Sequence, residues 1–266
     1  MVKHRWKIHK FGGSSLADAA CFRRVGNLLL GYSDVCMGVV VSAMGGMTDA
    51  LINLAVLAER DDRRYADELD AIGERYATTA QALLSGDHLV TLLDEWGKDA
   101  DDIRNVLQAI ALVKSAPQRS RDVVAGYGEI WSARLLATFL GSESPERGGT
   151  WIDTRKIITV RQTELGPSVL WDESQARFNE NVPDSLTGIA VVTGFIASDE
   201  DNLQTTLGRN GSDFSAAIFA ALSGASELTI WSDVDGVMSA DPRQVPEAQV
   251  IDRLTYSEAM ELAYFG

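Results

Sequence analysis

The chain has 266 residues, of which 45% are hydrophobic, so it can bury a substantial core and is not a disordered chain. Its 38 acidic and 24 basic residues give a formal net charge of −14. Without a Lys/Arg cluster, this charge argues against nucleic acid or an anionic membrane as the partner. The N-terminus is basic up to Lys7, but no apolar stretch is long enough for a signal peptide or a membrane span, so we expect a cytoplasmic protein.

The cysteine content predicts neither a disulfide framework nor a zinc site. Cys21 and Cys36 are the only two cysteines, and they have no partner at the spacing of zinc ligands. We therefore expect two buried free thiols in a reducing compartment.

The N-terminal part repeats a strand, a glycine turn and a helix. A short strand over 8–11 stops at Gly12 and precedes a helical pattern over about 17–30. A β-branched run over 37–42, suited to a strand buried on both faces, precedes a second helix over about 48–59. This repeat predicts an α/β fold with a mainly parallel sheet.

The stretch from about 63 to 140 has a different pattern. Apolar residues recur at spacings of three and four, and Pro117 is the only strong helix breaker. This predicts a helical lobe inserted over one end of the sheet. Glu129 follows Gly128 and is expected where one of these helices begins, so its carboxylate would either interact with the helix dipole or have a functional role.

The C-terminal part returns to alternating elements. We expect strands over 150–153, 157–160, 189–193 and 228–231, a polar helix over 173–180, an exposed hairpin over 198–202, helices over 214–222 and 256–264, and a loop over 232–243.

The first glycine turn carries a lysine ahead of it. Lys10 precedes Gly12 and Gly13 at a junction between a strand and a helix, where backbone N–H groups and a helix N-terminus receive phosphates. The turn is not a Walker loop, but the ammonium group of Lys10 could contact a phosphoryl group in transfer. A glycine pair of this kind is more often a simple turn, so the motif alone is weak.

A second turn, over 208–213, combines opposite charges. Arg209 offers a planar fork for a carboxylate, Ser212 can cap a helix or bind an anion, and Asp213 can hold an ammonium group or orient a lysine. A capped helix with a surface arginine is the alternative. It explains the serine but not why a cation and an anion share one tight turn.

A third segment follows the strand that ends at Trp231. Its Asp233-Val234-Asp235-Gly236 resembles part of a calcium loop, but the closing glutamate of an EF-hand is missing, so we set calcium aside. All three segments follow strands at the edge where open α/β sheets bind ligands. One shared cleft therefore explains them better than three independent turns.

Taken together, these segments resemble those of aspartokinase, in the amino acid kinase superfamily. The resemblance runs in order over nearly the whole chain, and it is closest to the kinase half of the bacterial fusion with homoserine dehydrogenase, in the form tied to methionine synthesis. The matching segments are 10–15 (KFGGSS), 41–44 (VSAM) with Thr48, 128–129 (GE), 193–195 (TGF), 207–216 (LGRNGSDFSA) and 231–243 (WSDVDGVMSADPR).

The resemblance implies a three-layer α/β/α sandwich with aspartate under its N-terminal half and ATP under its C-terminal half. The implied reaction converts ATP and L-aspartate to ADP and 4-phospho-L-aspartate, the first step toward lysine, threonine and methionine. Mg²⁺ would arrive with ATP and need no dedicated protein ligands. We also expect a homo-oligomer, and a dehydrogenase domain fused in the full-length protein.

The resemblance also implies roles for individual residues. The catalytic residues would be Lys10 and Asp213. The substrate site would contain Ser42, Thr48, Glu129, Arg209, Gly211 and Ser212. The ATP-binding residues would be Gly12, Gly13, Ser14, Ser232, Asp233, Met238 and Arg243.

The sequence departs from the family pattern at two places. It ends at Gly266, where members continue into a segment with a further ATP-contacting lysine, so we expect residues 1–266 to be a C-terminally truncated kinase domain with weak activity when isolated. Met238 stands where a tyrosine is common, although methionine fills similar apolar space. The alternatives are a kinase for glutamate, N-acetylglutamate, carbamate or a nucleoside monophosphate, and a silent nucleotide-binding module.

Overall fold

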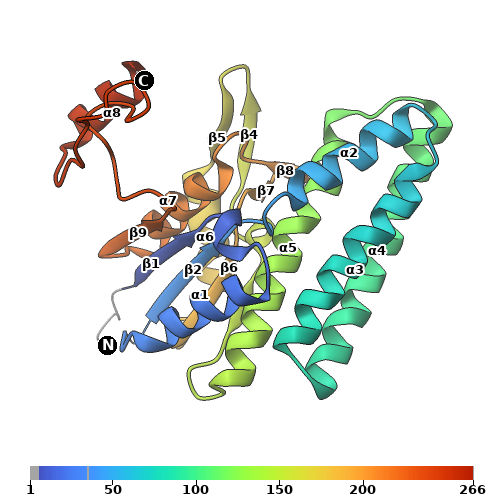
Figure 1. Ribbon diagram of the computed structural model, residues 1–266, viewed down its shortest axis with the longest axis horizontal. Coiled ribbons are helices and arrows are strands. Elements are labelled where there is room, and N and C mark those ends of the chain that lie inside the picture. Colours follow the sequence, from blue (N-terminus) through green and yellow to red (C-terminus); the bar gives the residue numbers. More distant parts are fainter. Residues whose placement is uncertain (1–5, 35, 266) are drawn as a thin grey trace. The chain divides into compact units, whose positions relative to one another are not determined.

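The computed structural model describes residues 6–34 and 36–265. These residues form two compact units, one ending at Trp231 and one beginning at Ser232. Within the described residues, the first unit is built on a five-stranded sheet of order β3-β6-β2-β1-β9, in which every neighbouring pair is parallel (Figure 1). Its strands are β1 (Lys7–Phe11), β2 (Cys36–Val41), β3 (Thr150–Ile152), β6 (Gly188–Thr193) and β9 (Glu227–Trp231).

Helices and two small hairpins complete the first unit. The helices are α1 (Ala19–Gly31), α2 (Met47–Glu59), α3 (Arg64–Leu83), α4 (Gly86–Val113), α5 (Gln118–Glu143), α6 (Trp171–Asn181) and α7 (Gly211–Ser223), with 3₁₀ turns at Gly13–Leu16 and Thr154–Lys156. The antiparallel hairpins pair β4 (Val160–Thr163) with β5 (Gly166–Val169), and β7 (Ile196–Ser198) with β8 (Gln204–Thr206).

The sheet is buried on both faces, as the β-branched run in β2 predicts. Successive side chains of a strand point to opposite faces. Val39 and Val41 accordingly pack into the core shared with α1, α2 and α5, whereas Val40 packs into the core that contains residues of α6 and α7. Helices on both faces of a parallel sheet confirm the expected α/β fold.

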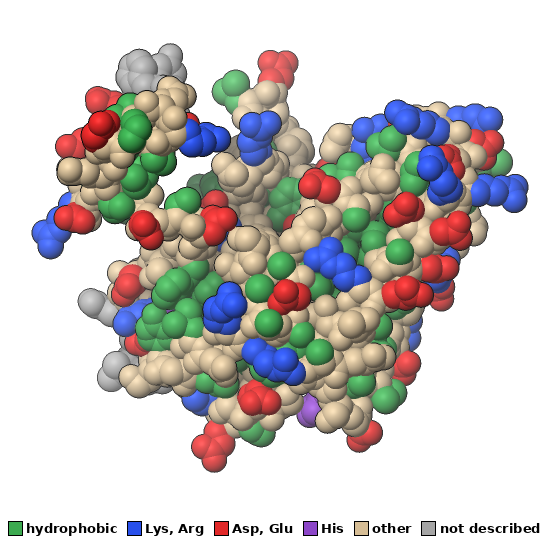
Figure 2. Space-filling model, in the orientation of Figure 1, with side chains coloured by type: hydrophobic (Ala, Val, Ile, Leu, Met, Phe, Trp, Pro, Cys, Tyr) green, Lys and Arg blue, Asp and Glu red, His purple; other side chains and the backbone are tan. Residues whose placement is uncertain are grey.

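The stretch from 63 to 140 is helical, as expected. Helices α3, α4 and α5 lie side by side, with α2 packed against them (Figure 1). On the face drawn in Figure 2, acidic and basic side chains are intermingled over this lobe. Among the described residues, no helix is both long and apolar enough to cross a membrane.

The expected helix start at Glu129 is wrong, because Glu129 lies in the middle of α5. Gly128 does not break the helix but serves close packing. A Cβ atom there would lie 3.0 Å from the Cβ of Ala43 and 3.3 Å from Met47. The glycine therefore lets α5 approach the loop after β2, and the macrodipole explanation of Glu129 does not apply.

Two further expectations need correction, and one hairpin was not expected. Residues 157–159 lie outside the named strands, and β4 begins only at Val160. Ile157 and Ile158 are nevertheless fully buried, so their apolar character reflects side-chain packing and not a strand. The β4–β5 hairpin was not expected. Cys36 is buried, but Cys21 is only half-buried, and both are free thiols. The expected hairpin over 198–202 is confirmed as the turn between β7 and β8.

The second unit contains the loop from Ser232 and helix α8 (Tyr256–Phe265). An isolated antiparallel bridge joins Met238 to Val250, and Arg243 pairs with Asp241 at 2.9 Å. The predicted loop and final helix are therefore present. The boundaries of the catalytic domain stay a prediction.

Candidate active site

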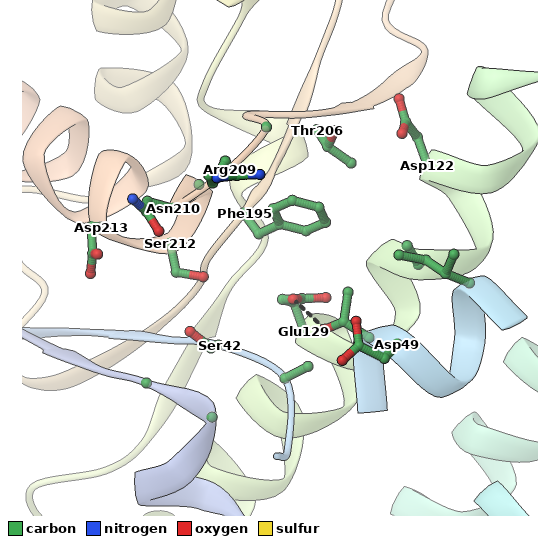
Figure 3. A pocket seen from close by; sticks show the side chains of 18 of the residues that line it. Ser42, Asp49, Asp122, Glu129, Phe195, Thr206, Arg209, Asn210, Ser212 and Asp213 are labelled. Carbon is green, nitrogen blue, oxygen red and sulfur yellow. Dashed lines mark hydrogen bonds between the residues drawn. The ribbon is translucent and has the colours of Figure 1, made fainter. Parts of the chain in front are cut away.

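A pocket of about 860 Å³ lies at the carboxyl ends of β1, β2 and β6, within the first unit (Figure 3). It brings together residues that are far apart in the sequence. The residues expected from the sequence that line it are Lys10, Gly12, Gly13, Ser42, Thr48, Glu129, Arg209, Gly211, Ser212 and Asp213.

Lys10 and Asp213 form an ion pair in this pocket. Lys10 is in β1, and its Nζ lies 2.7 Å from Oδ1 of Asp213 in the first turn of α7. The lysine side chain is 11% exposed and the aspartate side chain 40% exposed, so the pair is partly shielded from water. The carboxylate therefore fixes the direction of the ammonium group at the mouth of the first glycine turn.

Glu129 contributes a carboxyl group that is almost fully buried. Only 3% of the residue is exposed. Its Oε1 accepts a hydrogen bond from the Thr48 hydroxyl at 3.2 Å, and its Oε2 has no partner among the described residues. Burial raises the pKa of Glu129 to about 8, although hydrogen bonds, including the one from Thr48, oppose the rise. A cation beside Oε2 would favour the charged form.

The turn over 208–213 presents its side chains to the same pocket. Asn210 has a φ of 57° and is the N-cap of α7, so the backbone adopts a left-handed conformation just before the helix. Arg209 is exposed, and within the described part of the chain no hydrogen bond or ion pair involves its guanidinium group. In Figure 3, Ser212 and Asp213 extend from the start of α7, next to Asn210.

Ser42 is held in place by the helix that carries Glu129. The Ser132 hydroxyl, fully buried in α5, donates to the Ser42 backbone oxygen at 2.5 Å. The loop after β2 and helix α5 are thus joined at a residue that lines the pocket. The sequence gives no signal for Ser132, because a serine inside a helix has no distinctive pattern.

Five of the expected ATP-binding residues do not line this pocket. Ser14 follows the glycine turn and is exposed. Ser232, Asp233, Met238 and Arg243 belong to the second unit. Their role in nucleotide binding stays a prediction.

Several lining residues were not identified from the sequence. Asp49 of α2, Asp122 of α5 and Thr206 of β8 line the pocket, and Phe195 extends its ring into it (Figure 3). Burial raises the pKa of Asp122. Phe195 belongs to the Thr-Gly-Phe segment on which the family resemblance rests, so a signal for it was present. Asp49, Asp122 and Thr206 lie outside the segments that carry the resemblance, so no sequence signal identified them.

Comparison with known proteins identifies the family. The model of the amino acid kinase family matches residues 5–266. The chain belongs to the amino acid kinase family. The resemblance noted from the sequence is thereby confirmed.

Similar members of the amino acid kinase family include plant and bacterial proteins. Bifunctional aspartokinase/homoserine dehydrogenase 2, chloroplastic, of Arabidopsis thaliana is 39% identical over 264 residues, which cover 98% of this chain and 28% of that protein. Bifunctional aspartokinase/homoserine dehydrogenase 2 of Escherichia coli is 36% identical, with 97% of this chain and 31% of that protein covered. The chain is thus homologous to the aspartokinase region of these proteins and spans about a third of their length or less.

Solved structures of this family have the same fold. E. coli aspartokinase III in complex with aspartate and ADP superposes with a TM-score of 0.86 at 29% identity, covering 98% of this chain and 56% of that chain. The same enzyme in complex with lysine and aspartate gives a TM-score of 0.83 at 28% identity.

Proposed function

We propose that this chain is an aspartate kinase, which transfers the γ-phosphoryl group of ATP to the side-chain carboxylate of L-aspartate. The observation that carries the proposal is that the buried carboxyl group of Glu129 and the cationic groups of Lys10 and Arg209 line one pocket. A free amino acid has both an ammonium group and carboxylates, so it complements this pattern. N-acetylglutamate and a nucleoside monophosphate lack the ammonium group.

In this proposal the two charged ends of aspartate bind on separate elements. The α-ammonium group occupies the free side of Glu129 Oε2 and shifts that carboxyl toward its ionised form, while Thr48 holds the other oxygen. The guanidinium group of Arg209 receives the α-carboxylate in a bidentate manner. Ser42, Gly211 and Ser212 complete the substrate site.

The chemistry needs positioning more than proton transfer. The side-chain carboxylate of aspartate is ionised at neutral pH, so no general base is required. One of its oxygens forms a bond to the γ-phosphorus of ATP, and the bond from that phosphorus to the bridging oxygen of the ADP leaving group breaks. The ammonium group of Lys10, oriented by Asp213, stabilises the negative charge of the transferred phosphoryl group.

The nucleotide is proposed to bind with its phosphates over the first glycine turn. Gly12, Gly13 and Ser14 lie next to Lys10 at a strand-to-helix junction, which suits phosphate binding through backbone N–H groups. Ser232, Asp233, Met238 and Arg243 are proposed to contact ATP. Mg²⁺ would accompany the phosphates and neutralise part of their charge, because it binds substrate phosphates and waters more readily than all-protein sites.

One assay tests this proposal. ADP release is followed with L-aspartate, L-glutamate, N-acetylglutamate and UMP offered separately, on the 266-residue chain and on the full-length gene product. Activity with aspartate alone is the expected result. Activity with another acceptor alone contradicts the proposal, and silence in both proteins favours the nucleotide-binding module.

The wider context is part of the same proposal. The fused homoserine dehydrogenase, the homo-oligomer and the role in lysine, threonine and methionine synthesis are also proposed, because the bifunctional relatives contain a region that matches this chain. The cytoplasmic location stays a prediction, since some relatives are chloroplastic by name.

A further inference from the structure

Phe195 adopts a backbone conformation that is unfavourable for an aromatic residue. Its φ is 67°, in the left-handed region that large side chains avoid. The Ile196 N–H donates to the Gly194 carbonyl oxygen at 2.7 Å, so Phe195 is the central residue of a three-residue γ-turn in its rarer, strained form. Glycine would adopt this φ without strain.

The surrounding structure holds this strained turn in place. The Phe195 N–H donates to Ser215 Oγ at 2.9 Å, and the Ser215 hydroxyl donates in turn to the Gly211 carbonyl at 2.9 Å. The Phe195 carbonyl accepts the Leu207 N–H at 2.7 Å. Helix α7 and the segment after β8 therefore fix both ends of the residue. Backbone strain that the surrounding structure maintains is typical of functional sites.

The same constraints aim the aromatic ring into the pocket. A Cβ atom on Gly211 would lie 2.7 Å from Phe195 Cδ2, so the ring packs directly against the glycine at the start of α7. In Figure 3 the ring lies between the end of the pocket that contains Ser212 and Asp213 and the end that contains Asp49 and Asp122. All of these residues line one continuous pocket, so the ring narrows its middle.

The pocket is larger than an amino acid alone requires, and it also contains the glycine turn proposed to receive the ATP phosphates. Its volume of about 860 Å³ lies in the range of pockets for drug-sized ligands. Glu129 and Arg209 are proposed to hold aspartate by its charged groups. These contacts alone would not prevent a longer acceptor from binding with its α-carbon shifted toward Asp49 and Asp122. The ring of Phe195 is a rigid, apolar side chain in that path.

We propose that Phe195 limits the length of the acceptor that can bind, because its ring fills the space behind the α-carbon of the acceptor. A four-carbon dicarboxylic amino acid then reaches Lys10 with its side-chain carboxylate. A five-carbon acceptor needs its α-carbon displaced by about one carbon–carbon bond, ~1.5 Å, toward the ring, and is rejected. This inference rests on the proposed aspartate kinase function and adds the residue that separates aspartate from glutamate.

Two variants of the full-length protein test the inference. Phe195→Gly removes the ring and also relieves the backbone strain, and Phe195→Leu keeps an apolar side chain of smaller reach. The ratio of kcat/KM for L-aspartate to that for L-glutamate, measured by ADP release, does not depend on the fraction of protein that is folded. We expect this ratio to fall at least about 10-fold in Phe195→Gly, the scale on which a pocket discriminates one methylene, and less in Phe195→Leu.

A matched control and the opposing outcomes complete the test. Phe214→Leu changes a partly exposed phenylalanine of α7 that does not line the pocket, and it should leave the ratio unchanged. A wild-type protein with aspartate kinase activity and an unchanged ratio in the Phe195 variants overturns this inference alone. A wild-type protein without aspartate kinase activity overturns the proposed function itself. If Phe195→Gly does not fold, Phe195→Leu provides the test: a lower ratio supports the inference, and an unchanged ratio overturns it.

Discussion

Glu129 combines nearly complete burial with a carboxyl oxygen that lacks a hydrogen-bond partner. A buried carboxyl group without a counter-charge destabilises a fold in its ionised form. The pKa of about 8 means that the folded protein holds this proton over a pH range in which the unfolded chain, with a pKa near 4.5, has lost it. Such a residue is expected where a ligand supplies the missing charge.

This residue makes the stability of the unliganded protein fall with rising pH. Because the unfolded state binds fewer protons, the free energy of unfolding decreases between about pH 4.5 and 8. At about 1.4 kcal/mol for each pKa unit, the loss amounts to a few kcal/mol. Urea unfolding at pH 5.5 and 8.5 should show that Glu129→Gln lacks this loss. The free energy of unfolding of the variant, relative to that of the wild type, should therefore be higher at pH 8.5 than at pH 5.5.

The matched control for this measurement is Glu68→Gln, on the exposed face of α3. It should follow the wild type at both pH values. Equal differences between wild type and Glu129→Gln at pH 5.5 and 8.5 would contradict the raised pKa.

Arg209 provides a test of substrate binding at the residue scale. Replacing it by alanine removes the bidentate contact proposed for the α-carboxylate of aspartate, and hydrogen bonds to charged groups typically contribute about 1.5–3 kcal/mol. We expect the KM for aspartate to rise by roughly 10- to 100-fold and the KM for ATP to change little. Arg24→Ala, at an exposed position of α1, is the control. Steady-state kinetics that leave the aspartate dependence of Arg209→Ala unchanged would refute the assignment.

At the scale of elements, the helical lobe contacts the loop after β1, which is proposed to bind phosphate, and the loop after β2, which is proposed to bind the acceptor. Arg75 of α3 donates through Nη2 to the Gly45 carbonyl at 2.7 Å and to the Ala17 carbonyl at 3.1 Å. These carbonyl groups lie in the two segments that follow β1 and β2. One side chain of the lobe therefore joins both loops, which explains how a helical insertion can influence a site on the sheet.

Removing the Arg75 side chain should lower kcat/KM for ATP more than it changes the KM for aspartate. Each exposed hydrogen bond contributes about 0.5–1.5 kcal/mol, so we expect kcat/KM for ATP to fall roughly fivefold in Arg75→Ala. The KM for aspartate should stay within about twofold, and Arg75→Lys should restore part of the loss. Arg63→Ala, just before α3, serves as the control because its position is exposed. Equal losses for both substrates would indicate a purely structural role.

At the scale of the whole molecule, the proposed ligand should stabilise the fold. A ligand at ten times its Kd adds about 1.4 kcal/mol to the free energy of unfolding, or roughly 3 °C in Tm for a protein of this size. We expect L-aspartate to produce this shift in a thermal melt without ATP, and L-glutamate to produce a smaller one. Because the measurement needs no turnover, it separates aspartate binding from catalysis. A shift with neither amino acid, when ADP does produce one, would favour the nucleotide-binding module.

Local sequence patterns and the family resemblance predict the parallel sheet, the helical lobe and ten of the residues that line the pocket. These features depend on local patterns: the β-branched run of β2, the helical periodicity after residue 63, and the glycine turns beside Lys10 and Arg209. Such patterns fix which backbone conformation each segment prefers, and they can be read one segment at a time.

How these segments meet depends on long-range packing. Glu129 was expected at a helix start but lies within α5, because Gly128 is used for packing against Ala43 rather than for ending the helix. The strained turn at Phe195 and the hydrogen bond from Ser132 to Ser42 likewise depend on partners distant in the sequence. Long-range packing overrides local preference at these positions, so the depth, charge and shape of the pocket follow from the fold and not from any single motif.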